Sequence, residues 1–160
     1  MIRRALPSGA ALTLAVLFAA TQSAPATGGL PRCSLNSLRL VMEKTEGAAE
    51  QAVAFLDLVN RGAACRLSGT ATMTVARNGA TIGTIRNNPV TYPMNRTVAK
   101  GTTMLLNVWW MNWCGQRNGA FRVQGTLGQL SASGRFNYLP VCIHASAPSR
   151  LTGSLLNTTQ

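Results

Sequence analysis

The chain has 160 residues and a formal net charge of +11 at pH 7, from 15 basic and four acidic side chains. The basic residues are scattered along the sequence without any run, whereas a dedicated nucleic-acid site normally concentrates them on one face or motif. The composition therefore argues against nucleic-acid recognition, and the length fits a single domain with one hydrophobic core.

The N-terminus has the pattern of an export signal. Met1-Ile-Arg-Arg4 carries two positive charges, an apolar run follows over 10–20, and small residues lead to cleavage points after Ala24 or Ala26. This order is typical of a secretory signal peptide, and the apolar run is too short to span a bilayer. We expect a signal-peptide helix over 1–26, a short leader over 27–32 and one domain over 33–160. The mature chain is then secreted, extracellular or in the cell envelope, without a transmembrane segment.

The expected mature chain remains strongly basic. Removal of Arg3 and Arg4 lowers the number of basic residues from 15 to 13 and the net charge from +11 to +9. Scattered positive charge favours acidic surfaces such as anionic envelope polymers or phospholipid headgroups. Coding bias towards arginine, together with solubility, is an equally good explanation of the same residues.

Short strands separated by turns follow in chain order. Residues 37–42 and 51–59 predict two strands, and the acid-rich connection 43–50 has room for one helical turn. Asn78-Gly79 predicts a two-residue hairpin turn between strands at 67–76 and 80–85. Further strands are expected from the apolar patterns at the following positions: 104–114, 121–127, 136–143 and 151–156. About eight short strands without helical periodicity predict an all-β antiparallel sandwich or barrel.

The stretch 104–114 holds all three tryptophans and ends on a cysteine. As a strand it would place Trp110 on one face and Trp109 and Trp113 on the other, because successive side chains point to opposite sides. Trp110 is in phase with Leu106 and Val108, which favours Trp110 as the core residue.

Four cysteines in an exported chain indicate two disulfides. Three pairings are possible, and the expected strand order favours Cys33–Cys65 and Cys114–Cys142. No two cysteines lie close together in the sequence, which argues against a zinc site.

Several of these motifs together resemble a known family. The motifs are Phe55-Leu-Asp-Leu-Val-Asn60, Cys65-Arg-Leu-Ser-Gly69 and Trp110-Met-Asn-Trp-Cys114, all following Cys33. They resemble a secreted domain of unknown function found in high-GC Gram-positive (actinobacterial) bacteria, over nearly the whole span from 33 to 156. One departure is the Thr-Ala-Thr that follows Gly69, where the family more often has an aromatic-proline step. The resemblance implies an immunoglobulin-like β-sandwich with structural disulfides and no established activity.

Catalytic chemistry has little support in the sequence. The single histidine is His144 and the single aspartate is Asp57, and no nucleophile motif is present. Met94, Met104 and Met111 with His144 suggest a soft-ligand copper site, but methionines more often fill gaps in cores. We expect no enzymatic activity, no metal and no cofactor.

Two kinds of function remain. If the face opposite Trp110 is open, Trp109 and Trp113 with Asn107 and Arg117 form a candidate binding face for sugars or for a protein. If that side of the strand lies inside the sandwich, these residues form no exposed binding face. The favoured hypothesis is a non-catalytic extracellular or cell-envelope binding module for an acidic polymer, glycan or protein. The alternative is a secreted structural or inhibitory domain that acts on a protein partner through an exposed loop at 89–96.

Overall fold

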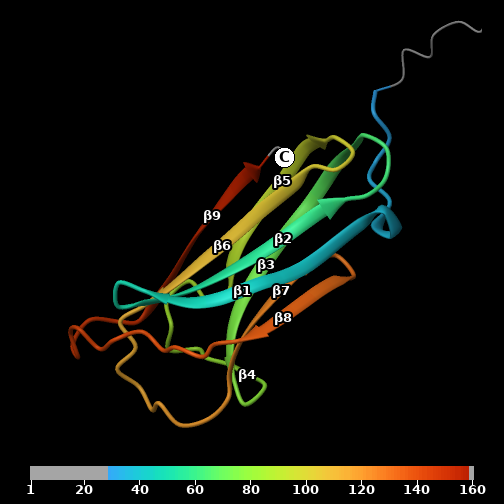
Figure 1. Ribbon diagram of the computed structural model, residues 1–160. Coiled ribbons are helices and arrows are strands. Elements are labelled where there is room, and N and C mark those ends of the chain that lie inside the picture. Colours follow the sequence, from blue (N-terminus) through green and yellow to red (C-terminus); the bar gives the residue numbers. More distant parts are fainter. Residues whose placement is uncertain (1–28, 159–160) are drawn as a thin grey trace, which may run out of the picture.

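Two antiparallel β-sheets pack face to face in the computed structural model, which describes residues 29–158 (Figure 1). The first sheet has the order β1-β2-β6-β9, with β1 at Leu38–Ala48, β2 at Gln51–Asn60, β6 at Thr103–Met111 and β9 at Arg150–Thr158. The second has the order β4-β3-β7-β8, with β4 at Ala80–Thr81, β3 at Cys65–Arg77, β7 at Phe121–Leu127 and β8 at Leu130–Arg135. β5, at Val90–Val98, also pairs with β3, and a 3₁₀ turn at Leu35–Ser37 precedes β1.

The predicted all-β antiparallel sandwich is confirmed, with nine strands in the described residues rather than about eight. Every second residue of β2, β6 and β7, and most of the alternate residues of β3, are buried between the sheets, as the two-residue period of a strand requires. The largest fully buried side chains are Trp110, Leu56, Leu58, Met73, Met104, Leu106 and Leu151. The expected signal-peptide helix lies outside the described residues.

The first hairpin is longer than predicted. Residues 43–48 continue β1 instead of forming a helical turn, and that expectation is wrong. Ala49 and Glu50 both have positive φ, 41° and 70°, and make a tight two-residue connection that keeps β1 paired with β2 as far as Ala48 and Gln51. The register shifts between Met42 and Lys44, so a bulge lies at Glu43.

The Asn78-Gly79 hairpin is confirmed, with φ of 50° and 85° at the two turn residues, although its second arm is only the two-residue β4. The segment 89–96 is not an exposed loop, because β5 pairs with β3 over nine residues. Pro93 is tolerated within β5 because β5 forms an edge of its sheet.

The strand expected at 136–143 is absent, because β8 ends at Arg135 and no strand follows until β9. Phe136 turns into the core, where it is 5% exposed, and its N–H donates to the carbonyl oxygen of Phe121. Pro140 lacks the N–H that a strand would use. The strand that packs on β7 is instead 130–135, reached by a tight turn in which Gly128 has a φ of 57°.

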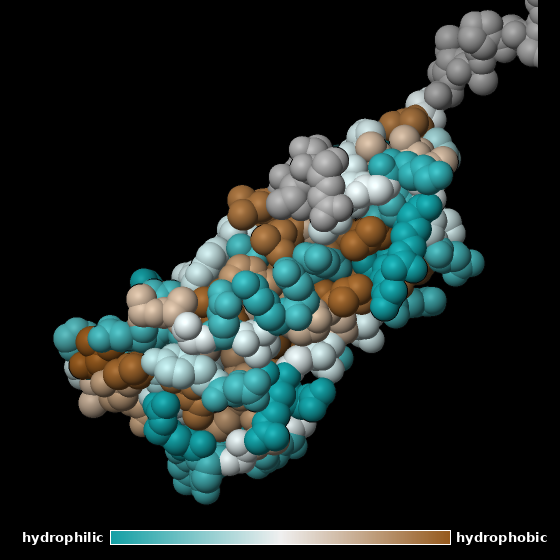
Figure 2. All heavy atoms as spheres, in the orientation of Figure 1, coloured by the Kyte–Doolittle hydropathy of each residue, from teal (hydrophilic) through white to brown (hydrophobic). Residues whose placement is uncertain are grey.

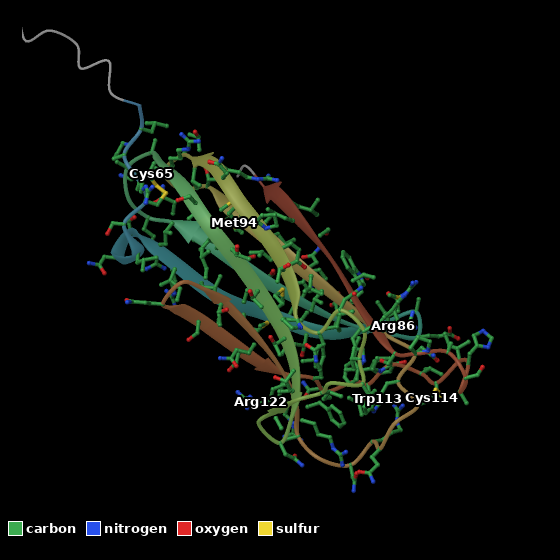
Figure 3. All side chains as sticks on the ribbon, turned by 180° about the vertical axis from the view of Figure 1, so that it is seen from behind. Cys65, Arg86, Met94, Trp113, Cys114 and Arg122 are labelled. Carbon is green, nitrogen blue, oxygen red and sulfur yellow. A yellow bond between two sulfur atoms is a disulfide. The ribbon has the colours of Figure 1, made fainter. Side chains whose placement is uncertain are left out.

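The favoured disulfides, Cys33–Cys65 and Cys114–Cys142, are both present. They lie at opposite ends of the sandwich, with Cys65 beside the first described residues and Cys114 at the far end (Figure 3). In the chain-entropy model, each closed loop of about 30 residues is worth ~3–4 kcal/mol.

Asn60, the residue that ends β2, is fully buried. Its side chain holds together the backbone at the end of the sandwich that carries the Cys33–Cys65 disulfide. Its Nδ2 lies 3.0 Å from the carbonyl oxygen of Ala63 and 3.2 Å from those of Val98 and Ala99. Its Oδ1 accepts the N–H of Gly62 at 3.0 Å. One amide therefore satisfies the backbone of two loops that no strand covers.

Replacement Asn60→Ala should lower the free energy of unfolding by about 2–3 kcal/mol, because buried backbone groups lose their partner. Urea unfolding followed by circular dichroism measures the loss. The matched control is Asn95→Ala, because Asn95 is exposed and accepts one hydrogen bond from exposed Arg66. That change should cost less than about 0.5 kcal/mol. Equal losses in the two variants would contradict the role given to Asn60.

Candidate binding faces

The structure does not bring the four predicted site residues together. Trp109 and Asn107 lie on the outer face of the β1-β2-β6-β9 sheet, where Trp109 is half-buried and Asn107 is 4% exposed. Trp113 is a core residue, 6% exposed. Arg117 lies in the connection to β7 and donates to the carbonyl oxygens of Pro140, at 2.9 Å, and Leu139, at 3.2 Å. The exposed face formed by these four residues is therefore not present.

Asn112 explains why Trp113 leaves the expected face. Its φ is 52°, in the left-handed region, so the alternation of the strand stops one residue before Trp113. The ring of Trp113 turns inwards, with its centroid 5.2 Å from that of Trp110 and 5.9 Å from that of Phe121. Its indole N–H donates to the carbonyl oxygen of Gln116. Asparagine is one of the few residues that tolerate this backbone conformation, but the sequence pattern alone did not reveal it.

The outer face around Trp109 is mixed in character. Apolar and polar side chains alternate over the face of this sheet that is turned towards the viewer (Figure 2). Lys44 lies over the ring of Phe55, with Nζ 5.0 Å from the ring centroid, and also forms an ion pair with Glu46 at 3.3 Å. Leu156 on β9 is 49% exposed.

Two oxygen atoms on this face lack hydrogen-bond partners in the described part of the chain. They are Oδ1 of Asn107 and Oγ of Ser154, which are paired directly across β6 and β9. Buried polar atoms without partners cost folding free energy, so these two oxygens weaken the outer part of this sheet.

Asp57 also lies on this outer face, opposite Val41 and Leu105 on the neighbouring strands. Burial among these side chains, and secondarily the charge of Glu43, raises the pKa of Asp57 above its ordinary value of 3.8. The ionised form of Asp57 is therefore less stable in the folded protein than in the unfolded chain, whereas a stabilising ion pair would lower the pKa.

The outer face of the other sheet differs in kind. Its side chains come from alternate positions of β5, β3, β7 and β8, and nearly all are hydroxyls, amides or arginines. We call it the hydroxyl face, and its members are Arg66, Ser68, Thr70, Thr72, Thr74, Thr91, Asn95, Thr97, Arg122, Gln124, Thr126, Ser131, Ser133 and Arg135. Ala76 and Pro93 occupy the remaining outward positions.

No carboxylate lies on the hydroxyl face. All four acidic residues of the chain belong to β1, β2 or the turn that joins them. Arg122 and Arg135 are directly opposite each other on β7 and β8, and Nη2 of Arg122 lies 3.2 Å from Oγ of Ser133. A shallow depression of about 300 Å³ lies beside Arg122 and is lined by Arg122, Gln124, Ser131 and Ser133 among others.

The residues of the suggested copper site are not brought together in the described part of the chain. Within 29–158, no group of three or more His, Cys, Asp and Glu residues is placed to hold a metal ion. Met94 and Met104 are core residues, 3% and 1% exposed, whereas Met111 and His144 lie near the protein surface. Met94 and Met104 therefore fill space between the sheets.

Comparison of the chain with protein-family models, with curated proteins and with solved structures finds no match. Over the part of the chain that the structure describes, no helix is long and apolar enough to cross a membrane.

Replacement Asp57→Asn should raise the melting temperature at pH 7. The folded protein binds the Asp57 proton more tightly than the unfolded chain, so ionisation above 3.8 costs folding free energy. This cost grows as the pH rises from 3.8 through the raised pKa and then stays constant. The gain of the variant over the wild type should therefore shrink as the pH is lowered and disappear below 3.8. Calorimetric melts of both proteins from pH 3 to pH 7 measure it, and a gain independent of pH would contradict the assignment.

Proposed function

We propose that this chain is an exported, non-catalytic binding module and that its ligand is an anionic glycan, bound on the hydroxyl face. An anionic glycan has the properties of both ligands that the sequence suggests, an acidic polymer and a glycan. Arginines bind carboxylate, sulfate or phosphate groups in a forked geometry, and hydroxyl and amide side chains exchange hydrogen bonds with sugar hydroxyls.

The observation that carries the proposal is the arginine pair Arg122 and Arg135. Like charges directly opposite each other on neighbouring strands destabilise a sheet. No carboxylate is available on this face to relieve the repulsion. An anion held between the two guanidinium groups would relieve it, and the depression lined by Arg122 leaves space for a sugar ring.

The flatness of the face suits a chain-like ligand. Thr70, Thr72 and Thr74 follow one another along the outer side of β3, and Thr126 and Ser131 continue the row across β7 and β8. A third arginine, Arg66, lies towards the other end of β3. An extended polyanion could therefore contact Arg66 and the Arg122 pair together, with hydroxyl groups between them.

Export is supported by the leader pattern of the sequence and by the two disulfides, which persist in oxidising compartments. The resemblance to a secreted actinobacterial family with an immunoglobulin-like sandwich supports the same location and the absence of enzymatic activity. The +9 charge of the expected mature chain favours association with an acidic envelope.

A protein partner is the second candidate, as a structural or inhibitory secreted domain. The exposed loop expected at 89–96 does not support it, because that segment is mostly strand. The outer face around Trp109 supports it instead, since Leu156 is exposed and Trp109 is only half-buried there.

The double variant Arg122→Gln/Arg135→Gln should bind dextran sulfate at least about tenfold more weakly than the wild type at low salt, because two charge-assisted contacts are lost. Its dependence of affinity on salt should also be shallower, because fewer counterions are released. Fluorescence titration of the labelled polymer over a salt series measures both, with uncharged dextran as the ligand control.

The matched protein control is Arg39→Gln/Arg61→Gln, which removes the same charge away from the hydroxyl face. At the point of the salt series near 0.15 M, its affinity should stay within about threefold of wild type, because exposed charges more than ~8 Å from the bound polymer are largely screened there. Equal losses in both double variants would mean that net charge alone governs binding, and no binding of dextran sulfate at low salt would overturn the proposed ligand.

A further inference from the structure

A second cationic site lies at the end of the sandwich that carries Cys114–Cys142. It is a groove of about 390 Å³ between the end of β6, the start of β9 and the segment 143–148. In Figure 3 Arg86 and Cys114 are labelled at this lower end, on the right of the view, and Arg122 is labelled to the left of them. Its volume falls in the range of small-molecule sites.

Two arginines form the polar side of the groove. Arg86 and Arg150 are partners in a parallel bridge, in which Arg86 N donates to Ser149 O and Leu151 N to Arg86 O, both at 2.9 Å. Within residues 29–158 neither guanidinium has a hydrogen-bond or ion-pair partner in the protein. His144 also lines the groove, and no carboxylate does.

The remaining wall of the groove is apolar. It is formed by Met111, Ile143, Ala147 and Pro148. Ile143 is 50% exposed and has the highest exposure of the large apolar side chains in the described residues. An exposed apolar wall beside unpaired cations fits a ligand with both characters.

The loop that completes the groove is held in place before any ligand arrives. Nδ2 of Asn112 donates to the carbonyl oxygens of His144 and Ala147, at 3.0 and 2.8 Å. Oδ1 of Asn112 accepts the N–H groups of Ile143 and His144, at 2.9 and 3.0 Å. The Cys114–Cys142 disulfide fixes the start of the same loop. A preorganised loop loses little conformational entropy when a ligand binds.

We infer that this groove binds a small amphiphilic anion, in which one carboxylate or phosphate group carries an apolar chain or ring. The anionic group lies between Arg86 and Arg150, and the apolar part covers Met111 and Ile143. This site is separate from the hydroxyl face, because Arg150 belongs to β9 in the other sheet.

The test uses octanoate as the probe, with octan-1-ol and acetate as probes that lack the charge or the chain. Backbone amide shifts of Ile143 and His144, measured by NMR on the oxidised protein, report binding. Octanoate should shift both amides saturably, with an affinity at least tenfold above that of either control. Equal affinity for octan-1-ol would overturn the anionic part of the inference, equal affinity for acetate would overturn the apolar part, and no shift with octanoate would overturn the whole.

The variant Arg86→Gln/Arg150→Gln should bind octanoate at least tenfold more weakly, whereas Arg39→Gln/Arg61→Gln, with the same loss of charge, should stay within twofold. The backbone bonds of Arg86 and Arg150 survive these changes, since only side chains are altered. Should the double variant melt, Arg150→Lys keeps the charge without the planar fork and should bind at least threefold more weakly. Unchanged octanoate binding in Arg86→Gln/Arg150→Gln, or in Arg150→Lys where the double variant does not fold, would overturn the assignment.

The variant Arg122→Gln/Arg135→Gln distinguishes binding in the groove from the proposed binding of a polyanion on the hydroxyl face. It should leave octanoate binding within twofold of wild type while it weakens the binding of dextran sulfate. Loss of octanoate binding in this variant would overturn the separate site in the groove.

Discussion

The buried indole of Trp110 is the contact on which the rest of this molecule depends. Its ring is fully buried within 5.2–5.6 Å, centroid to centroid, of Trp113, Phe121 and Phe136. Its N–H donates to Oγ of Ser149, which in turn donates to the carbonyl oxygen of Met111. One side chain therefore joins both sheets and the start of β9. Because an indole N–H must find a partner when buried, the position of Ser149, and with it the groove wall beside Arg150, follows from the placement of Trp110.

The sequence was most informative where one local rule decides the structure. Two-residue alternation identified Trp110 as a core residue, and Asn78-Gly79 determined a turn because both residues tolerate positive φ. It failed where a tertiary contact overrides local pattern. Phe136 opens an apolar run that resembles a strand, yet it turns into the aromatic cluster and ends the pairing. Asn112 reverses the expected direction of Trp113 through a single backbone angle, which no periodicity reveals.

The distribution of charge over the surface was harder to predict, because the register of the strand pairs decides which arginines lie opposite each other. Along the sequence the arginines are scattered, but the folded sheets place Arg122 opposite Arg135 and Arg86 opposite Arg150. The members of each pair are separated by 13 and 64 residues and meet only through strand pairing. The four acids, by contrast, all stay on the β1–β2 hairpin, because they are close in the sequence. The result is one mixed outer face and one that carries only positive charge.

Opposed arginines without carboxylates cost folding free energy in the isolated chain. A sandwich closed by two disulfides and an aromatic cluster can tolerate this cost, since each disulfide contributes ~3–4 kcal/mol in the chain-entropy model. Local repulsion of this kind is removed by an anion that binds only the folded state, and such a ligand stabilises the protein in proportion to its occupancy. In the function that we propose, the rigid parts of the sandwich hold the cations in place, and a bound anion would supply the negative charge that the hydroxyl face lacks.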